Sequence, residues 1–551
     1  MFIAKQITSL EKVRQFSQLS YNEIEKQSVL RGERFSYQIS MLSNPQVIGR
    51  VRIESPISDY VRIYKVKQSV MDRPTTYGVQ EIGYITTEPG LMPDLLIPWE
   101  KSDIIRVGHD ATSLWIELNL PDTVEAGEYP ITFIFDEIDS LKPEEAPKQR
   151  VSKTMTVEVL PITAEKQSLI CTRWFYADCI ASYHNVPIYS DAHFDLIEAY
   201  VREAVDIGIN MILVPIHTPP LDTAIGTTRP CVQLVDIKKE GDKYIFGFEK
   251  LRRFIEICKR SGVLYYEMAH MFSQWGAKCA ANIMVEENGK RDYMFGWHTD
   301  STSPIYIDFL KQYISAIAKE LEALGVAENT YYHISDEPTL DKIDAYRAAV
   351  EAIRPFIGSS RTFDALSDYA FYEQGLVECP VTGVNHVHEF IPHGIRNQWT
   401  YYCCGPQYTY TNAFMAMPSW RTRILGVLLY KYDIKGFLHW GFNFYNSALS
   451  YYPINPYSTT SADGNLPSGD PFIVYPAPDG AYPSIRGKVT YEAICDLNLC
   501  RTLEKRIGRE AVVKMIDEIA GFDVRFDEYP LDAEYLPKLR KAIIEKIKEH
   551  I

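Results

Sequence analysis

The chain contains 551 residues, of which 46% are hydrophobic and 23% are charged, and its formal net charge is −15 at pH 7. This length exceeds a single compact core, so two or three domains are expected, and the composition is that of a chain that folds throughout. The acidic excess is dispersed along the sequence, which argues against a nucleic acid or an anionic membrane surface as a partner.

The start of the chain and its cysteines bear on the compartment. Residues 1–6 lack the features of a secretory signal, and no apolar run is long enough to cross a bilayer. A cytoplasmic protein without a membrane partner is therefore expected. All ten cysteines fall at or after Cys171 without a CxxC pair, which predicts neither a disulfide framework nor a structural zinc site. The adjacent Cys403 and Cys404 are expected to be a reduced, buried pair.

Short segments of alternating hydrophobicity, separated by turn residues, occupy the first part of the chain. Examples are residues 47–53, 113–118 and 129–135. Period-two alternation with frequent breakers predicts a β-sandwich. The last such segment is followed by Pro161, so an all-β sandwich domain is expected over residues 1–161.

Beyond residue 161 the pattern changes to strands that alternate with helices, which is typical of parallel strands joined by helical crossovers. The predicted strands are 169–175, 210–215, 263–268, 330–335, 358–363, 381–387, 400–403 and 435–440. The clearest predicted helices are 191–207, 249–260, 305–324, 341–353 and 420–432. Eight strands predict an α/β fold, a (β/α)₈ TIM barrel over residues 162–506.

Three long insertions follow the second, third and eighth predicted strands, at residues 216–248, 269–304 and 441–489. All three come after a strand, so they should lie on one face of the barrel and wall a deep cleft. Apolar residues at helical spacing in 535–551 predict that residues 507–551 form a short C-terminal helical segment packed on the barrel.

The fourth predicted strand ends in two adjacent carboxylates, Asp336 and Glu337, followed by Pro338. Catalytic groups of barrel enzymes stand at this end of the strands. Adjacent residues do not readily span a sugar ring as the acid and nucleophile of most retaining glycosidases do. Adjacency suits substrate-assisted hydrolysis, in which the 2-acetamido oxygen is the nucleophile, Glu337 is the acid/base and Asp336 orients the acetamide. Acids that merely complement the dipole of the following helix explain the spacing equally well.

Aromatic residues make up 13% of the chain, and several stand at the ends of predicted strands. Flat rings stack on the apolar faces of sugars, although a single tryptophan at a strand end is more often a core residue. The residues expected to bind substrate are Trp399, Trp440, Trp275, Asn443 and His270, with Trp440 and Trp399 as the preferred stacking platforms.

Two histidines offer a competing explanation. His386 and His388 are alternate residues of a predicted strand, so they would share a face and could bind one metal ion. Spacing identifies no further ligands, and imidazoles at a barrel mouth also bind hydroxyl groups. A metal-dependent barrel hydrolase is therefore one alternative, and a non-catalytic carbohydrate-binding protein is another. The favoured prediction requires no metal and no cofactor.

Several motifs resemble a known family. Residues 399–406 (WTYYCCGP) and 436–443 (GFLHWGFN) look like the last two barrel strands of glycoside hydrolase family 123-type catalytic domains, and residues 335–338 (SDEP) are similar to the acidic pair of that family. Residues 469–476 and 483–486 resemble the segment before its closing helix. The resemblance spans roughly residues 168–506, and a preceding β-sandwich matches the usual arrangement of the family.

The resemblance implies a β-N-acetylgalactosaminidase that works with substrate assistance. By this analogy Asp336 orients the acetamide, Glu337 is the general acid/base, and a tyrosine hydrogen-bonds the acetamide oxygen, with Tyr402 favoured over Tyr401. The sequence thus predicts a retaining glycoside hydrolase that acts on terminal β-linked 2-acetamido sugars. The expected partner is a small carbohydrate substrate, without nucleic acid or membrane, and a homo-oligomer is left open.

Overall fold

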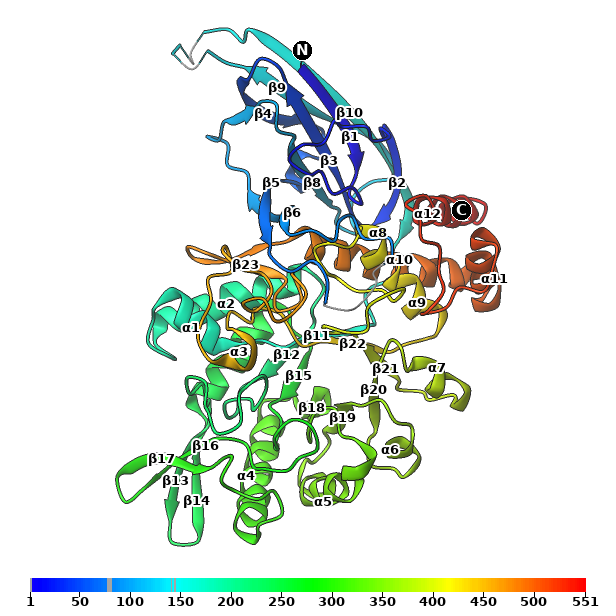
Figure 1. The fold of residues 1–551 in the computed structure, drawn as a ribbon. Coiled ribbons are helices and arrows are strands. Elements are labelled where there is room, and N and C mark those ends of the chain that lie inside the picture. Colours follow the sequence, from blue (N-terminus) through cyan, green and yellow to red (C-terminus); the bar gives the residue numbers. More distant parts are fainter. Residues whose placement is uncertain (1, 77–81, 140, 143–144) are drawn as a thin grey trace. The chain divides into compact units, whose positions relative to one another are not determined.

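The computed structural model describes the whole chain except residues 1, 77–81, 140 and 143–144. The chain groups into two compact units, and each is built from separate stretches of sequence. One unit comprises Met1–Gln167, Thr411–Lys431 and Tyr482–Ile551, and the other comprises Ser168–Tyr410 and Tyr432–Ala481. Figure 1 follows the chain through both units.

The first unit contains a sandwich of two five-stranded sheets. The first sheet has the order β1 (Phe2–Thr8), β3 (Arg34–Ser43), β8 (Thr112–Asn119), β5 (Val61–Met71) and β6 (Gly90–Pro98). The second has the order β2 (Lys26–Arg31), β10 (Gln149–Thr163), β9 (Gly127–Glu137), β4 (Val47–Glu54) and β7 (Ile105–Val107). Apolar residues of both sheets, such as Ile116 and Phe133, share one core, so the predicted sandwich is confirmed.

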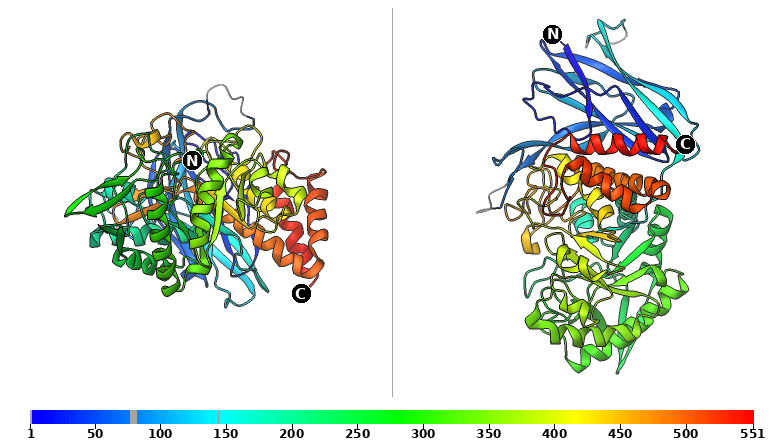
Figure 2. Two further views of the ribbon diagram at one scale, coloured as in Figure 1. Left: turned by 90° about the horizontal axis from the view of Figure 1, so that it is seen from below. Right: turned by 90° about the vertical axis from the view of Figure 1, so that its right-hand side faces the viewer.

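The outer face of the first sheet is covered by the long helix α10 (Ile485–Ile507). Trp115 alternates along β8 with residues of the sandwich core, so its ring points to the outer face. There Tyr64, Leu96 and Trp115 pack against Ile485 and Val489 of the helix. The right-hand view of Figure 2 places the C-terminal helices, orange to red, beside the sandwich.

A buried ion pair reinforces this contact. Arg486 of α10 and Asp94 of β6 are each about 1% exposed, and Arg486 Nη2 lies 2.9 Å from Asp94 Oδ2. Removing one member of such a pair leaves an uncompensated buried charge, which is strongly destabilising. The helix is therefore an integral part of the sandwich unit.

The described part of the first unit has four further α-helices: α8 (Ser419–Arg423), α9 (Leu425–Lys431), α11 (Arg509–Ala520) and α12 (Tyr535–Lys548). All of them pack on α10, and Arg540 of α12 pairs with Glu33. The expected domain boundaries at residues 161 and 506 do not coincide with the compact units, because the chain enters the sandwich unit three times. The tail, expected on the barrel, is grouped with the sandwich.

The second unit contains a closed barrel of eight parallel strands, as predicted. In order around the barrel these are β11 (Ile170–Arg173), β12 (Met211–Val214), β15 (Tyr265–Met268), β18 (Thr330–Tyr332), β19 (Arg361–Ala365), β20 (Cys379–Gly383), β21 (Trp399–Tyr401) and β22 (Gly436–His439). β22 pairs with β11 to close the barrel. Strands such as β12 are buried along their whole length, which is typical of a parallel sheet covered on both faces.

The helices of the barrel unit are α1 (Ala177–His184), α2 (Asp191–Asp206), α3 (Glu249–Ser261), α4 (Pro304–Ala323), α5 (Ile343–Ile353), α6 (Ala370–Glu373) and α7 (Val387–Phe390). Two of them start with ordinary helix-start signals. The Ser190 hydroxyl accepts from the N–H of His193 at the start of α2, and Pro304 occupies the first turn of α4. No helix in the described part of the chain has the length and hydrophobicity needed to cross a membrane.

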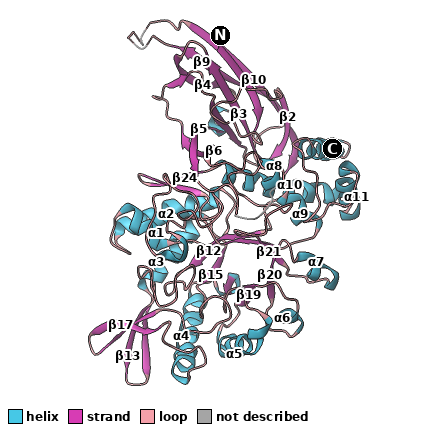
Figure 3. Cartoon of the chain, viewed as in Figure 1, coloured by secondary structure: helices cyan, strands magenta, loops and turns pink. Residues whose placement is uncertain are grey.

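The insertions after the second and third barrel strands pair with each other. The first contributes β13 (Asp236–Glu240) and β14 (Lys243–Gly247), and the second contributes β16 (Ile283–Glu287) and β17 (Lys290–Phe295). Together they form a four-stranded sheet in the order β14-β13-β16-β17, drawn in magenta in Figure 3. The segment that leads away from the eighth strand carries the hairpin of β23 (Val474–Ala477) and β24 (Gly480–Pro483).

Candidate active site

A cavity of about 320 Å³ lies where the barrel strands end. The residues that line it are Trp174, Asp222, Gln274, Trp275, Asp336, Glu337, Ala365, Tyr401, Cys403, Cys404, Leu438, Trp440, Phe444, Ala448, Leu449 and Leu466. All three long insertions contribute to this lining, as expected of a walled cleft. Three of these described lining residues are acids, and none is a lysine, arginine or histidine.

Asp336 is buried at this cavity, with 6% of its surface exposed. Strand β18 ends at Tyr332, and the chain then runs through an irregular segment to the two acids. Gln274 Nε2 donates to Asp336 Oδ2 at 2.9 Å, and the N–H of Trp275 donates to the Asp336 carbonyl at 2.8 Å. Burial, together with the negative charge of Glu337, raises the pKa of Asp336 well above its ordinary value.

Glu337 adopts a left-handed backbone conformation, with φ of 44°. This region is uncommon for residues other than glycine, and such residues gather at functional sites. The Glu337 N–H donates to the carbonyl of Ala365 at 3.0 Å, and the Tyr401 hydroxyl donates to Glu337 Oε1. The turn therefore brings two consecutive carboxylates to the same cavity.

A buried ionic network lies inside the barrel next to this segment. His333 Nδ1 is 2.9 Å from Asp364 Oδ1, and His333 Nε2 contacts Glu267. Glu267 also accepts from Trp174 Nε1 at 2.7 Å, and Trp174 lines the cavity. Burial by itself lowers the pKa of His333, but the two carboxylates outweigh it and raise this pKa to about 9.

Asp364 also holds the backbone that leads to the acid pair. Its carboxylate accepts from the N–H of Ile334 at 3.1 Å and from the N–H of Ser335 at 3.3 Å. The Tyr346 hydroxyl donates to the same carboxylate. The segment between β18 and Asp336 is therefore fixed by side-chain hydrogen bonds from the neighbouring strand rather than by sheet pairing.

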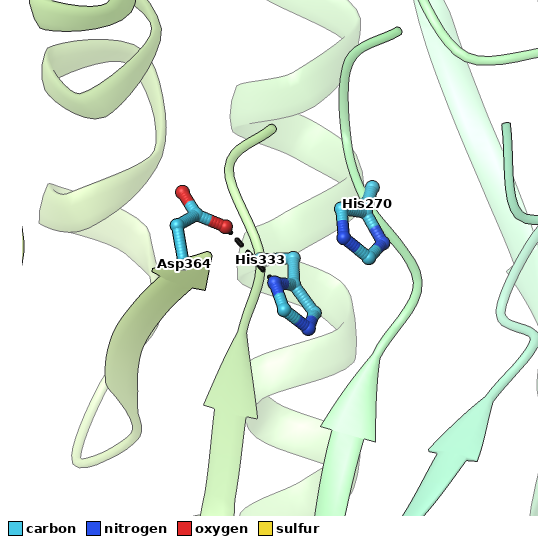
Figure 4. Close-up of side chains that lie close together, drawn as sticks. All are labelled: His270, His333 and Asp364. Carbon is cyan, nitrogen blue, oxygen red and sulfur yellow. Dashed lines mark hydrogen bonds and ion pairs between the residues drawn. The ribbon is translucent and has the colours of Figure 1, made fainter. Parts of the chain in front are cut away.

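His270, His333 and Asp364 bring three ligand-type atoms within 4.8 Å of one another, the one such group in the described residues (Figure 4). Zinc binds imidazole nitrogen at about 2.0–2.1 Å, along the lone pair in the plane of the ring. The rings of His270 and His333 are stacked, 3.8 Å between centroids and 11° between planes, so their lone pairs run side by side instead of converging. Both nitrogens of His333 already face carboxylates. The trio fits a hydrogen-bond network better than a metal site.

His386 and His388 do not share a strand face, so that prediction is wrong. Strand β20 ends at Gly383, and the N–H of His386 donates back to the Gly383 carbonyl at 2.8 Å in a turn. His386 Nδ1 lies 3.1 Å from Glu389 Oε1, and the side chain of His388 is 72% exposed. Strand β20 ends four residues before the predicted strand end at residue 387.

The remaining predicted binding residues divide into two groups. Trp440 and the half-exposed Trp275 line the cavity, and Trp440 Nε1 donates to Asp470 Oδ2 at 3.0 Å. Trp399, Asn443 and His270 do not line it. Trp399 is a core residue packed against the rings of Tyr331 and Phe363. Asn443 binds the backbone N–H and carbonyl of Tyr176, and His270 is fully buried against His333.

Tyr401, not Tyr402, lines the cavity. Tyr402 is fully buried, and its ring packs against Phe437 and His439 at centroid distances of 4.9 and 5.4 Å. Consecutive residues at the end of a strand point to opposite sides. The choice between the two tyrosines therefore depended on the register of β21, which the apolar run 399–403 does not define.

Sequence reasoning missed Asp222 and Gln274. Asp222 comes from the first insertion, and it accepts from the Tyr176 hydroxyl at 2.9 Å. Burial raises the pKa of Asp222 to about 6. Gln274 connects two acids of the site, since its Oε1 accepts from the N–H of Asp222 at 2.7 Å while its Nε2 donates to Asp336. Both residues lie in loops without periodicity, and their position after a strand was the only available signal.

A larger cavity of about 460 Å³ belongs to the sandwich unit. Its arginines are already paired, for example Arg423 with Glu492 at 2.8 Å and Arg540 with Glu33 at 2.6 Å. It lacks the convergence of buried acids seen in the barrel cavity. The barrel cavity is therefore the candidate active site.

Residues 174–503 match the family model described as the glycoside hydrolase 123 catalytic domain. The fold is similar to that of a family 123 glycoside hydrolase from Clostridium perfringens, studied for the details of glycolipid glycan hydrolysis. The two share 16% sequence identity at a TM-score of 0.76, over 100% of this chain and 99% of that chain. A weaker likeness, at 9% identity and a TM-score of 0.34, is to a bacterial Ig-like domain containing GH10 xylanase from termite gut, over 87% of this chain and 100% of that one. None of the curated proteins matches the sequence.

Proposed function

This chain belongs to glycoside hydrolase family 123, and from that premise we propose that it hydrolyses terminal β-linked 2-acetamido sugars, above all β-N-acetylgalactosaminides, with retention of configuration. The observation that carries the proposal is the position of Asp336 and Glu337 on one turn at the barrel cavity. Two consecutive carboxylates suit substrate assistance, because the nucleophile is then part of the sugar.

Glu337 is the general acid and base of the proposed reaction. Its carboxyl proton passes to the glycosidic oxygen as the bond from C1 to that oxygen breaks, while the acetamide carbonyl oxygen bonds to C1 from the opposite face. The product of this step is a cyclic oxazolinium ion. A water molecule that loses a proton to Glu337 then attacks C1 and reopens the ring, so the sugar is released in the β configuration.

Asp336 orients the acetamide and stabilises the positive charge of the oxazolinium ion, and for this it must be ionised. Burial and the charge of Glu337 raise the pKa of Asp336, whereas the hydrogen bond from Gln274 and the positive charge of His333 lower it. Gln274 and the His333 network therefore favour the form of Asp336 that the mechanism uses.

Tyr401 takes the role expected of Tyr402. Its hydroxyl is at the cavity beside Glu337, while Tyr402 is enclosed by Phe437 and His439. Trp440, held by Asp470, and Trp174, held by Glu267, offer rings to the apolar face of a sugar. The described lining carries three acids and no basic residue, which favours a neutral terminal sugar over a sulfated or sialylated one.

The decisive test compares an aryl 2-acetamido-2-deoxy-β-galactoside with the matching plain β-galactoside. Turnover of the acetamido substrate alone, with a β product seen by NMR, supports substrate assistance. Turnover of the plain galactoside points instead to a protein nucleophile, and Asp222 is the first carboxylate to replace in that case.

The Glu337→Gln variant separates the hydrolase from a carbohydrate-binding protein. The amide has nearly the same volume as the carboxyl group but cannot transfer the proton. We therefore expect kcat to fall by roughly 10²-fold or more while the affinity for ligand changes little. A variant that retains full turnover contradicts the assignment of Glu337. Binding of the acetamido sugar to both forms, with no turnover by either, favours the non-catalytic alternative.

A further inference from the structure

Two adjacent thiols form part of the wall of the active-site cavity. Cys403 and Cys404 follow β21 directly and both line the cavity. Neither is in a disulfide, both are partly exposed, and their Sγ atoms are 3.9 Å apart. The proposed mechanism uses neither thiol.

The spacing of the two sulfur atoms suits a bridging ion. A disulfide requires about 2.05 Å between sulfurs, far less than the observed separation. Two thiolates bound to one tetrahedral zinc ion at about 2.3 Å each are separated by about 3.8 Å. We propose that Cys403 and Cys404 chelate a soft divalent cation of the zinc and cadmium type, and that this cation inhibits the enzyme.

The electrostatics of the cavity favour a cation. Asp222, Asp336 and Glu337 line the same cavity, and none of its described lining residues is basic. Such a lining raises the local concentration of cations. Thiolate ligands then select soft ions over magnesium and calcium, which prefer oxygen.

The site is expected to be reversible. Among the described residues, no third histidine, cysteine or carboxylate ligand lies close enough to both thiols to form a ready group of three. Water would complete the coordination, so chelators should remove the ion easily, unlike a structural site with four protein ligands. Binding displaces thiol protons and should weaken as the pH falls.

Inhibition follows from the place of the ion. A cation at Cys403 and Cys404 occupies part of the cavity that the sugar needs. We expect inhibition that competes with substrate. This consequence rests on the proposed function, whereas binding of the ion does not.

The experiment measures the binding of the ion and its inhibition of turnover, both on the full chain. Cadmium titration should give the ultraviolet absorption of a cadmium thiolate in the wild type and in Cys279→Ser, a matched control whose partly exposed thiol is outside the cavity. The band should be lost in Cys403→Ser/Cys404→Ser. Zinc should raise the apparent KM with little change in kcat, EDTA should reverse this, and the double variant should need at least tenfold more zinc.

The proposal is overturned if the double variant gives the same cadmium band and the same zinc inhibition as the wild type. If that variant does not fold, Cys403→Ala and Cys404→Ala are compared singly, and wild-type thiols are blocked with methyl methanethiosulfonate before the titration. Cadmium binding that survives blocking is then the contradicting result. Because the titration requires no turnover, failure of the glycosidase assay does not affect its outcome.

Discussion

At the scale of single residues, the barrel holds buried charges in and beside its cavity. Asp336 is buried beside Glu337, and His333 lies between Glu267 and Asp364. Buried charges persist when neighbours compensate them or when function requires them. His333 is the compensated kind, because it lies between two carboxylates, so replacing it should destabilise the fold. Asp336 faces another acid, so replacing it should stabilise the fold.

Asp336→Asn should stabilise the fold while it removes activity. The pKa of Asp336 is raised in the folded state, so ionised Asp336 destabilises the protein near neutral pH, and an amide relieves that cost. We expect the free energy of unfolding to rise by about 0.5–2 kcal/mol, the range typical of single stabilising substitutions. Urea unfolding and kcat are the measurements, with the exposed Glu351→Gln as control. A less stable or fully active Asp336→Asn variant contradicts the role given to this residue.

His333 should make stability depend on pH. Its folded-state pKa of about 9 lies above the ordinary value of 6.5, so its contribution is fully present below pH 6.5 and is lost as the pH rises toward 9. His333→Gln should therefore be less stable than the wild type at pH 6, and this difference in the free energy of unfolding should be smaller at pH 9. Denaturant unfolding at both pH values measures the difference. A difference that does not change with pH would show that His333 is not charged.

At the scale of elements, the sequence predicted the strands better than their ends. Every predicted barrel strand overlaps an observed one, because short apolar runs between helical patterns identify buried parallel strands. The residue at which each strand ends decides which side chains face the cavity, and the apolar pattern does not define that residue. His386 lies in a turn beyond β20 and His388 lies in the short helix α7, while Tyr402 points away from the cavity at the end of β21. Asp336 and Glu337 were identified because two acids interrupt an aromatic run.

The packing of β21 against β22 gives a prediction for the barrel itself. A Cβ atom on Gly436 would lie 2.0 Å from Cδ2 of Trp399, whose ring is buried. Gly436→Ala should destabilise the protein by about 1–3 kcal/mol or more, as expected of overpacking. Gly90→Ala is the control, since a Cβ there meets nothing within 4 Å. Equal thermal midpoints for the two variants would mean that Trp399 can shift.

At the scale of the whole molecule, the chain does not divide into consecutive domains. The hydrophobic pattern changes near residue 161, and the last sandwich strand, β10, ends at Thr163. Local patterns do not reveal that residues 411–431 and 482–551 return to the sandwich unit. Helix α10 covers an apolar face of the sandwich that the first 167 residues leave open. The amphipathic pattern of the tail predicted that it packs on another part of the chain. The expected partner was the barrel, whereas the tail is grouped with the sandwich.

A fragment of residues 1–167 should therefore fail to behave as an independent domain. Without α10 it exposes Tyr64, Leu96 and Trp115, and it leaves Asp94 without Arg486. An apolar patch of this kind promotes association. We expect the fragment to aggregate or to bind a hydrophobic dye strongly, with the full chain as control. A monomeric fragment with a cooperative unfolding transition would contradict this.

On the ribosome, helix α10 is synthesised long after the sheet that it covers. The two sheets emerge first, yet the helix that closes their outer face is made only after the barrel sequence. At roughly 5–20 residues per second, that face waits for tens of seconds. The nascent chain thus offers chaperones a long-lived binding surface, and the codons of α10, not those of the sheets, determine when the sandwich reaches its native state.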